Sequence, residues 1–448
     1  MTVNQRDGLG TTGLQDNAGD TSTDQGYLPG ELGDFARISD RIKEDIRAEH
    51  LAPRRDSIEP IKLGVTQVAD LLQKSTNGIR RLDKQDVLDL KLIRGDRQRV
   101  YYTLDQVEII RRHFRQMPRR SDSDPTAIVA INSLKGGSSK SATTLHLAHR
   151  YALDGYRVLV LDCDPQGTIT SYFGLRPDVD VDDDITIGPI IAGDHTNLLP
   201  CIQKTHFHGL DYVPASLEMY GSEMMAYARQ MQRNQDPKQR NWRYYESLSI
   251  AIDTVKDNYD IILLDTPPSL SAMTFNALYA SNCLLVPMAP AMDELLSVAQ
   301  YFSLVNEWYA TVAKIDPSFG HPECGGKPFH WVRIALTRYN RSTAEKLVMQ
   351  FIAQRMGKER VLRNFVVHSS EVSNAAANRK SLYELDGPIG SREAYRRALA
   401  SMDGMATEVR ELIESTWPSH GKAGELDLWS DGGPEEGSDV MLPAEGAA

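Results

Sequence analysis

Residues 126–150 read TAIVAINSLKGGSSKSATTLHLAHR, and this stretch decides the fold. Its first six residues form a short, almost continuously apolar segment, which favours a strand buried in a parallel sheet. A glycine-rich turn follows at 135–141, and we expect a helix over about 140–153. A glycine-rich turn between a strand and a helix lets backbone N–H groups surround a phosphate, and the helix N-terminus adds a favourable partial charge. The sequence therefore predicts a site for nucleotide phosphates.

Two side chains of this turn have specific roles in such a site. We expect the amine of Lys140 to reach the β- and γ-phosphates and the hydroxyl of Ser141 to bind Mg²⁺. The cofactors predicted are therefore ATP and Mg²⁺. The expected nucleotide-binding residues are Lys135, Gly136, Gly137, Ser138, Ser139, Lys140, Ser141 and Ala142.

Four further apolar segments continue an alternation of strands and helices. They are YRVLVLD at 156–162, GLDYVPA at 209–215, YDIILLD at 259–265 and NCLLVPM at 282–288. Short apolar strands separated by helical stretches are typical of a parallel sheet that helices cover on both faces. The fold class predicted is α/β, that of a P-loop NTPase.

Three motifs together carry a resemblance to a known family. The pattern K-G-G-x-x-K-S at 135–141 resembles the deviant Walker A motif of the ParA/MinD ATPases. The segment LDCDPQG at 161–167 is similar to a second motif of that family, and Asp164 lies 24 positions after Lys140. Asp265 ends its apolar segment where the family has the Walker B carboxylate.

The resemblance implies a role for each of these residues in an ATP hydrolase. Asp164 would position or activate the attacking water, because phosphoryl transfer to water requires an aligned nucleophile. Lys135 would reach across a nucleotide-sandwich dimer to the partner's phosphates. The expected catalytic residues are thus Lys135, Lys140 and Asp164, and the expected metal-binding residues are Ser141, Asp162 and Asp265.

The sequence departs from the family pattern at two residues. Ser139 replaces the glycine that most often precedes the P-loop lysine, and Ser141 replaces a threonine. A serine at 141 keeps the hydroxyl, whereas Ser139 must accept whatever backbone geometry the turn requires. A lowered nucleotide affinity is the expected consequence.

The charge of the chain is uneven along its length. The formal net charge is −11, but residues 36–120 hold 20 lysines and arginines against 13 acidic residues, a surplus of +7 that leaves −18 for the rest. A locally basic block on an acidic chain is typical of a separate DNA-binding module. A solvated charged face is the other interpretation.

The sequence of that block favours the DNA-binding interpretation. LGVTQVADLLQKSTNGIRRLDKQ at 63–85 predicts a helix from about Thr66, a turn at about 74–77 and a second helix, which is a helix-turn-helix pattern. IRGDRQRVYYTLDQVEIIRRHF at 93–114 resembles a wing followed by a helix from about Leu104. The candidate DNA contacts in this block are Arg80, Arg81, Arg97 and Arg99, with Arg94 beside them.

Changes in composition divide the chain into six parts. Residues 1–33 are predicted to be a disordered tail, and 34–52 a helix with an apolar stripe at Phe35, Ile38, Ile42 and Ile46. This stripe would either pair with the same helix of a second subunit or pack on the neighbouring domain. The remaining parts are a winged helix-turn-helix domain at 53–117, a linker at 118–125, the ATPase domain at 126–416 and an acidic disordered tail at 417–448.

The resemblance extends over residues 35 to about 415 and is closest to the RepA group of repABC plasmid replicons. LTRYN at 336–340 and VLRNFVVHSSEVSNAAANRKSLYEL at 361–385 resemble the end of the ATPase domain in that group. Family members bind non-specific DNA through basic residues of this half. The candidates by location are Arg338, Arg341, Arg363, Arg379 and Lys380.

The function implied is DNA partition. An ATP-bound homodimer would coat nucleoid DNA, a centromere-binding partner of the ParB or RepB type would stimulate a weak ATPase, and the N-terminal domain would bind and repress its own operator. The alternative is a nucleotide-sensing transcriptional repressor with little ATP turnover. A MinD-like membrane positioner would need a basic amphipathic C-terminal helix, whereas this chain ends acidic.

Composition limits the other classes of function. No apolar run approaches the roughly 20 residues that span a bilayer, and the N-terminus lacks the features of a secretory signal, so we expect a cytoplasmic protein without a membrane partner. Cys163, Cys201, Cys283 and Cys324 form no C-x-x-C pair. This spacing suggests neither a zinc site nor a disulfide framework, and it lacks the paired ligands of an iron–sulfur carrier. We expect reduced, buried cysteines.

Overall fold

The computed structural model describes residues 30–49, 59–84, 88, 90, 92–94, 100–118, 120–235, 242–315 and 329–420. The chain divides into two compact units, Met1–Leu51 and Ala52–Ala448. In the first unit, helix α1 (Glu31–Glu49) begins three residues before the predicted start at residue 34. Its exposed apolar side chains include Phe35, Ile38 and Ile42, which form the predicted stripe, whereas the side chain of Ile46 lies outside the described residues.

The second unit begins with a small domain of helices and short strands. Helices α2 (Val65–Leu71) and α3 (Thr76–Lys84) pack together through Val68, Leu72 and Ile79, which are buried. Strands β1 (Leu63–Gly64), β2 (Ile93–Arg94) and β3 (Val100–Tyr102) form an antiparallel sheet in the order β1-β3-β2, and helix α4 (Leu104–His113) follows. The two helices and the hairpin therefore form where the sequence predicts them.

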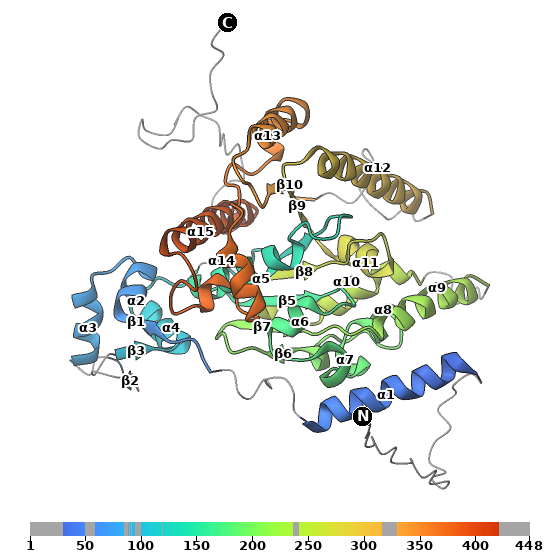
Figure 1. The fold of residues 1–448 in the computed structure, drawn as a ribbon, viewed down its shortest axis with the longest axis horizontal. Helices are drawn as coiled ribbons and strands as arrows, with labels where there is room; N and C mark the ends of the chain where they lie inside the picture. The colour runs from blue at the N-terminus through green and yellow to red at the C-terminus, as the bar shows by residue number, and fades with distance from the viewer. Residues whose placement is uncertain are drawn as a thin grey trace, which may run out of the picture. The chain divides into compact units, whose positions relative to one another are not determined.

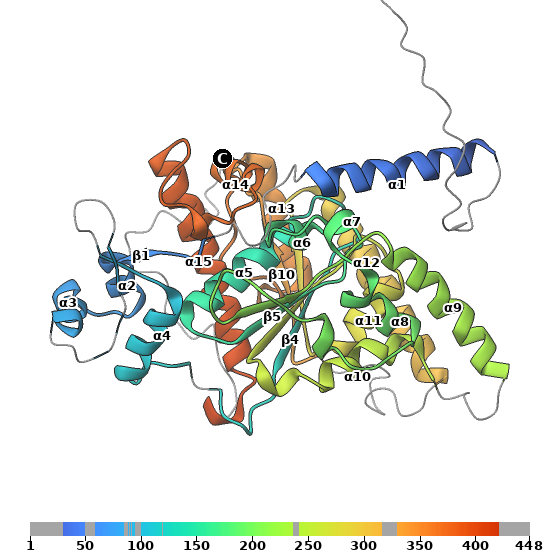
Figure 2. The ribbon, with the colours of Figure 1, turned by 90° about the horizontal axis from the view of Figure 1, so that it is seen from below.

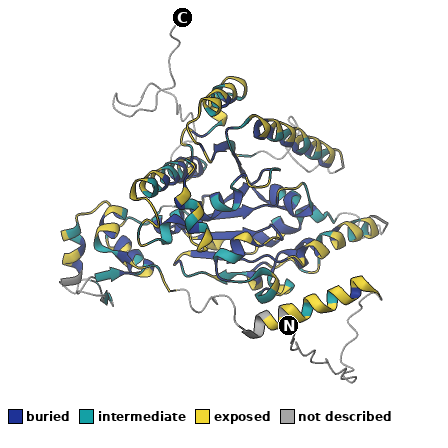
Figure 3. Ribbon diagram, in the orientation of Figure 1, coloured by how far each residue is buried: buried dark blue, intermediate teal, exposed yellow. Residues whose placement is uncertain are grey.

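A seven-stranded sheet forms the centre of this unit (Figures 1 and 2). Its order is β10-β9-β4-β8-β5-β7-β6, and every neighbouring pair is parallel except β7 and β6. Figure 3 shows that the strands are the most buried part of the fold. The strands are β4 (Ala127–Ile131), β5 (Val158–Asp162), β6 (Gln203–Lys204), β7 (Leu210–Val213), β8 (Ile261–Asp265), β9 (Cys283–Met288) and β10 (Trp331–Leu336).

Helices cover both faces of the sheet, as predicted. One face packs against α5 (Lys140–Asp154) and α15 (Arg392–Glu414), with Val129 and Ile131 of β4 in that core. The other face packs against α8 (Gly188–Ala192), α10 (Ser247–Asp253), α11 (Ala272–Ala280) and α12 (Met292–Ile315), with Ile128 and Ala130 pointing to them. The remaining helices are α6 (Thr168–Tyr172), α7 (Pro177–Asp180), α9 (Met219–Gln235), α13 (Thr343–Met356) and α14 (Ser370–Ala377). Among the described residues, no helix is both long enough and apolar enough to span a bilayer.

The predicted start of the C-terminal tail at Trp417 is wrong by four residues. Trp417 is fully buried, and its Nε1 donates a hydrogen bond to the Pro125 carbonyl oxygen over 3.1 Å. Ser419 donates from its backbone N–H to Asp124 over 2.9 Å, so residues 417–420 are tied to the segment that precedes β4. The acidic composition after residue 420 masked this anchor, and that later stretch lies outside the described residues.

The cysteines agree with the sequence interpretation where they are described. Cys163, Cys201 and Cys283 are free and buried, and Cys324 lies outside the described residues. Burial raises the pKa of the Cys201 thiol to about 11, which keeps it protonated and unreactive at neutral pH.

Candidate functional site

The glycine-rich turn connects the carboxyl end of β4 to the first residue of α5, where a phosphate-binding loop is required. Gly137 has φ +76° and Ser139 has φ +71°, so both residues adopt the left-handed conformation. Glycine adopts it without strain, but a residue with a Cβ pays roughly 1–2 kcal/mol. The turn thus requires the glycine geometry at 139, and the serine there holds it under strain.

The side chain of Lys140 folds back into this loop. Its Nζ donates hydrogen bonds to the carbonyl oxygens of Ser133 at 3.0 Å and Lys135 at 3.3 Å. Burial lowers the pKa of Lys140, although the nearby Asp265 and Asp164 oppose that effect. The ammonium therefore lies within the loop, where it can exchange backbone carbonyls for the oxygens of a phosphate.

Asp162 and Asp265 lie side by side because they are register partners at the carboxyl ends of β5 and β8. Asp265 Oδ1 accepts a hydrogen bond from Thr144 Oγ1 over 3.0 Å. Its burial raises the pKa of Asp265 to about 7. Two buried carboxylates so close together need a cation or a proton for compensation.

Asp162 and Asp164 occupy a tight turn after β5. Asp162 Oδ2 accepts hydrogen bonds from the backbone N–H of Thr170 at 2.9 Å and from its Oγ1 at 2.7 Å. Asp164 is 8% exposed and accepts a hydrogen bond from Gln166 N over 3.0 Å. Burial raises the pKa of Asp164 as well. Asp162 is thus held in place by Thr170, while Asp164 is buried as well but keeps a small exposed fraction.

Several buried polar atoms around this loop have no hydrogen-bond partner among the described residues, and they test whether a nucleotide and a metal fit. They are Asn132 Oδ1, Ser133 Oγ, Ser138 Oγ, Asp265 Oδ2 and Glu294 Oε2. Buried polar atoms are normally satisfied, so these atoms are available to donate hydrogen bonds to a ligand at the loop or to accept them from it. Among the described residues, no group of three or more His, Cys, Asp or Glu side chains is arranged to hold a metal ion.

Lys135 forms ion pairs with two acidic residues of its own chain. Its Nζ pairs with Asp293 and lies 3.5 Å from Glu294 Oε1, both in the first turn of α12. The hydrogen bond with Asp293 raises the pKa of Lys135. Gly136 has open space where a Cβ would be, and Ser141 and Ala142 are partly buried at the start of α5. The predicted nucleotide residues therefore form one continuous loop.

The DNA-contact candidates do not form one site. Arg80 and Arg81 are exposed on α3, whereas Arg97 and Arg99 lie outside the described residues, as does the side chain of Arg94. Arg341, Arg379 and Lys380 are exposed, and Arg363 Nε lies 3.6 Å from Glu408 Oε1. Arg338 differs from the others because it lies beside the phosphate-binding loop.

Asn132, Thr144, Thr170 and Glu294 also belong to the site and were not singled out from the sequence. Asn132 and Thr266 join the ends of β4 and β8 through a 2.6 Å hydrogen bond, while Thr144 and Thr170 hold the two buried carboxylates. Thr144 lies one helical turn after Lys140, and that spacing could have identified it. Thr170 and Glu294 are found only through the tertiary structure.

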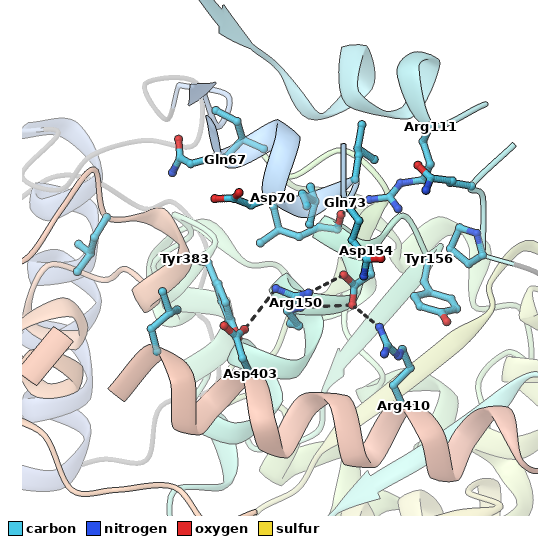
Figure 4. Close-up of a pocket in the computed structure, with 18 of the residues that line it drawn as sticks. Gln67, Asp70, Gln73, Arg111, Arg150, Asp154, Tyr156, Tyr383, Asp403 and Arg410 are labelled. Carbon is cyan, nitrogen blue, oxygen red and sulfur yellow. Dashed lines mark hydrogen bonds and ion pairs between the residues drawn. The ribbon is translucent and has the colours of Figure 1, made fainter. Parts of the chain in front are cut away.

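A second feature is a pocket of about 640 Å³ where α2 and α4 meet α5 and α15 (Figure 4). Arg150 pairs with Asp154 at 2.9 Å and with Asp403 at 3.3 Å, and Arg410 pairs with Asp154 at 3.3 Å. These ion pairs neutralise most of the charge that lines the pocket. The pocket lies at the far end of α5 from Lys140, so it belongs to the junction of the two domains and not to the phosphate site.

The fold and the loop geometry together define a P-loop nucleotide-binding protein, and comparisons with known proteins agree. Residues 126–315 match the family described as AAA domain. A candidate replication protein A of Sinorhizobium fredii is 27% identical over 365 residues, which cover 80% of this chain and 87% of that protein. The chromosome-partitioning ATPase Soj of Treponema pallidum is 33% identical over 283 residues, which cover 62% of this chain and 98% of that protein.

A solved structure described as a partition protein shares the fold. Its TM-score is 0.61 at 19% identity, and the match covers 88% of this chain and 99% of that one. The chain belongs to the ParA/MinD family of P-loop partition ATPases, in which it resembles the RepA-type members.

Proposed function

We propose that this protein is a DNA-partition ATPase. Its ATP-bound homodimer binds non-specific DNA, and hydrolysis of the ATP releases the protein from that DNA. The observation that carries the proposal is the placement of Lys140, Asp164 and Asp265 around one loop that has unpartnered buried polar atoms. Membership of a partition ATPase family supports the same conclusion.

Each residue of the site has its own role in binding or hydrolysing ATP. The backbone N–H groups of 136–141 and the Lys140 ammonium bind the phosphates, while Thr144 and Thr170 orient Asp265 and Asp162 beside them. Ser141, with Asp162 and Asp265 behind it, would hold Mg²⁺, which would compensate the developing phosphate charge. Asp164 aligns the attacking water, because it is the one of the three carboxylates that keeps some exposure, 8%, whereas Asp162 and Asp265 are fully buried. Release of Lys135 from Asp293 and Glu294 frees it for the phosphates of the partner subunit.

The remaining parts of the chain supply the DNA-binding functions. The α2–α3 pair binds operator DNA through Arg80 and Arg81, which are exposed on α3, and so represses its own operon. Arg341, Arg363, Arg379 and Lys380 bind non-specific DNA after ATP has closed the dimer. A centromere-binding partner of the ParB or RepB type stimulates the weak intrinsic hydrolysis. These activities place the protein on the nucleoid in the cytoplasm.

The test is ATP hydrolysis by the purified full-length chain, alone, with non-specific DNA, and with DNA plus the partner. We expect slow turnover that rises with DNA and partner and disappears in Lys140→Ala and Asp164→Ala. Lys256→Ala is the matched control, because this lysine is exposed and pairs only with Asp253 at a distance from the loop. Turnover that is undetectable under every condition, with ATP still bound, would contradict the motor and leave a nucleotide-sensing repressor.

A further inference from the structure

Arg338 was a candidate DNA contact by location, but its side chain lies at the phosphate-binding loop. It follows β10 with φ +54°, a left-handed conformation that turns the chain back toward the loop. Its Nη1 is 4.0 Å from the position that a Cβ on Gly137 would occupy. The preceding residue, Thr337, donates a hydrogen bond from Oγ1 to the Ser138 carbonyl oxygen over 3.4 Å. The loop after β10 is therefore attached to the phosphate-binding loop itself.

A buried carboxylate holds the guanidinium there. Glu294 is 3% exposed, and its Oε1 lies 3.6 Å from Arg338 Nη2 and 3.5 Å from Lys135 Nζ. Its Oε2 has no hydrogen-bond partner among the described residues. One acid thus holds two cations at the edge of the loop, and the Arg338 side chain stays 45% exposed toward solvent. A guanidinium anchored through one nitrogen keeps its other donors available for a ligand.

The order of the strands decides which end of a nucleotide Arg338 can reach. The carboxylates Asp265 and Asp162 end β8 and β5, on one side of β4, whereas Arg338 follows β10, on the other side beyond β9. Mg²⁺ and the terminal phosphate belong with the carboxylates. A nucleotide that lies across the end of β4 therefore directs its α-phosphate and nucleoside toward Arg338.

We infer that Arg338 is a nucleotide-binding residue of this chain's own loop, positioned by Glu294, and that it contacts the part of the nucleotide common to ATP and ADP. The inference rests on the proposed function and adds to it a binding residue outside the three recognised motifs. A guanidinium at the α-phosphate end contributes equally to both nucleotides and does not participate in hydrolysis.

The test is equilibrium binding of ADP and of a non-hydrolysable ATP analogue to the full-length protein, with kcat measured at saturating ATP. We expect Arg338→Ala to raise the Kd of both nucleotides by about tenfold, the loss of one charge-assisted hydrogen bond, and to change kcat by less than about twofold. Arg338→Gly should do the same while relaxing the left-handed backbone, so it separates lost binding from misfolding. Arg360→Ala, an exposed arginine paired with Glu359 at 3.4 Å, is the matched control.

Each other outcome has a definite meaning. A loss confined to the ATP analogue would place Arg338 at the terminal phosphate and overturn the inference, as would unchanged Kd values in both Arg338 variants. If Lys140→Ala weakens binding while the Arg338 variants do not, this inference fails and the proposed function stands. If the wild-type protein binds neither nucleotide, the proposed function itself fails.

Discussion

Arg111 donates a hydrogen bond from Nη2 to the carbonyl oxygen of Leu153 over 2.9 Å, and so joins helix α4 to the C-terminal end of helix α5. Figure 4 shows Arg111 on α4 above the α5 residues Arg150 and Asp154. Arg111 is 7% exposed, and burial lowers its pKa. A cation at a helix C-terminus is favourable because it complements the helix dipole. Since α5 begins at Lys140, one rigid helix connects the phosphate-binding loop with the small N-terminal domain.

Replacing Arg111 should loosen this connection. We expect Arg111→Ala to lower the free energy of unfolding by about 1–3 kcal/mol, because the buried Leu153 carbonyl loses its charged donor. Proteolysis of the segment 114–125 should become faster, while ATP hydrolysis continues. Arg112→Ala is the control, because Arg112 is 69% exposed and pairs only with Glu108. Equal unfolding energies and unchanged proteolysis for the two variants would contradict the role of Arg111.

The strain at Ser139 predicts a stabilising substitution. Ser139→Gly should raise the free energy of unfolding by about 1 kcal/mol, because glycine adopts φ +71° without the Cβ penalty. Nucleotide affinity should rise as well, since the loop no longer opposes its binding geometry. Chemical denaturation and nucleotide titration measure the two effects. Ser138→Gly is the comparison, because Ser138 is absent from the residues with positive φ and the added flexibility should lower stability there. If Ser139→Gly instead lowers the free energy of unfolding, the left-handed conformation of Ser139 does not destabilise this loop.

One of the two buried histidines of α5, His149, predicts a pH dependence of stability. His149 stacks on Phe207 at 4.0 Å, and its Nδ1 lies 2.7 Å from Ser381 Oγ. Burial lowers the pKa of His149 to about 3, although the carboxylate of Glu384 at 3.5 Å opposes that effect. The folded state therefore keeps the ring neutral where the unfolded chain takes up a proton below an ordinary pKa of 6.5.

The contribution of neutral His149 to the free energy of unfolding is fully present above pH 6.5 and is lost as the pH falls toward 3. Below pH 6.5 we expect His149 to lower the free energy of unfolding by about 1.4 kcal/mol for each pH unit. Urea unfolding at pH 7.5, 6.0 and 5.0 measures it, and His149→Phe should make the dependence shallower by about that amount per unit. His368→Gln, at an exposed histidine, serves as the control. A slope in His149→Phe equal to that of the wild type would assign the acid sensitivity to other groups.

Trp417 anchors the end of the described chain, so we expect its replacement by a small residue to destabilise the fold strongly. Trp417→Ala should lower the free energy of unfolding by about 3–5 kcal/mol, because a fully buried indole leaves a cavity in the core. Trp417→Phe should cost about 1 kcal/mol, since it keeps most of the packing and loses the hydrogen bond to Pro125. Thermal and urea unfolding provide the measurement. A loss below 1 kcal/mol for the alanine variant would mean that residues 417–420 are dispensable.

Local patterns in the sequence determined most of the sheet and the phosphate-binding loop. Five strands were predictable, because each is a short apolar run between helical segments: β4, β5, β7, β8 and β9. The phosphate-binding loop was predictable because its glycines and lysines lie close together in the chain. Strand β10 was not, because the charged Arg333 interrupts its apolar run. The two-residue β6 carries too little sequence to show any period.

Only the tertiary structure decided the partners of the site. Glu294 reaches Arg338 across 44 positions because the sheet places the ends of β9 and β10 side by side. Trp417 reaches Pro125 across 292 positions, and Thr170 folds back onto Asp162. Residue spacing reports contacts within a helix or a turn, but it contains no record of which strand ends are neighbours. The sequence by itself thus determined the class of ligand and the loop that holds it. The strand order determined that Arg338, which the sequence suggested as a DNA contact, lies beside the nucleotide loop.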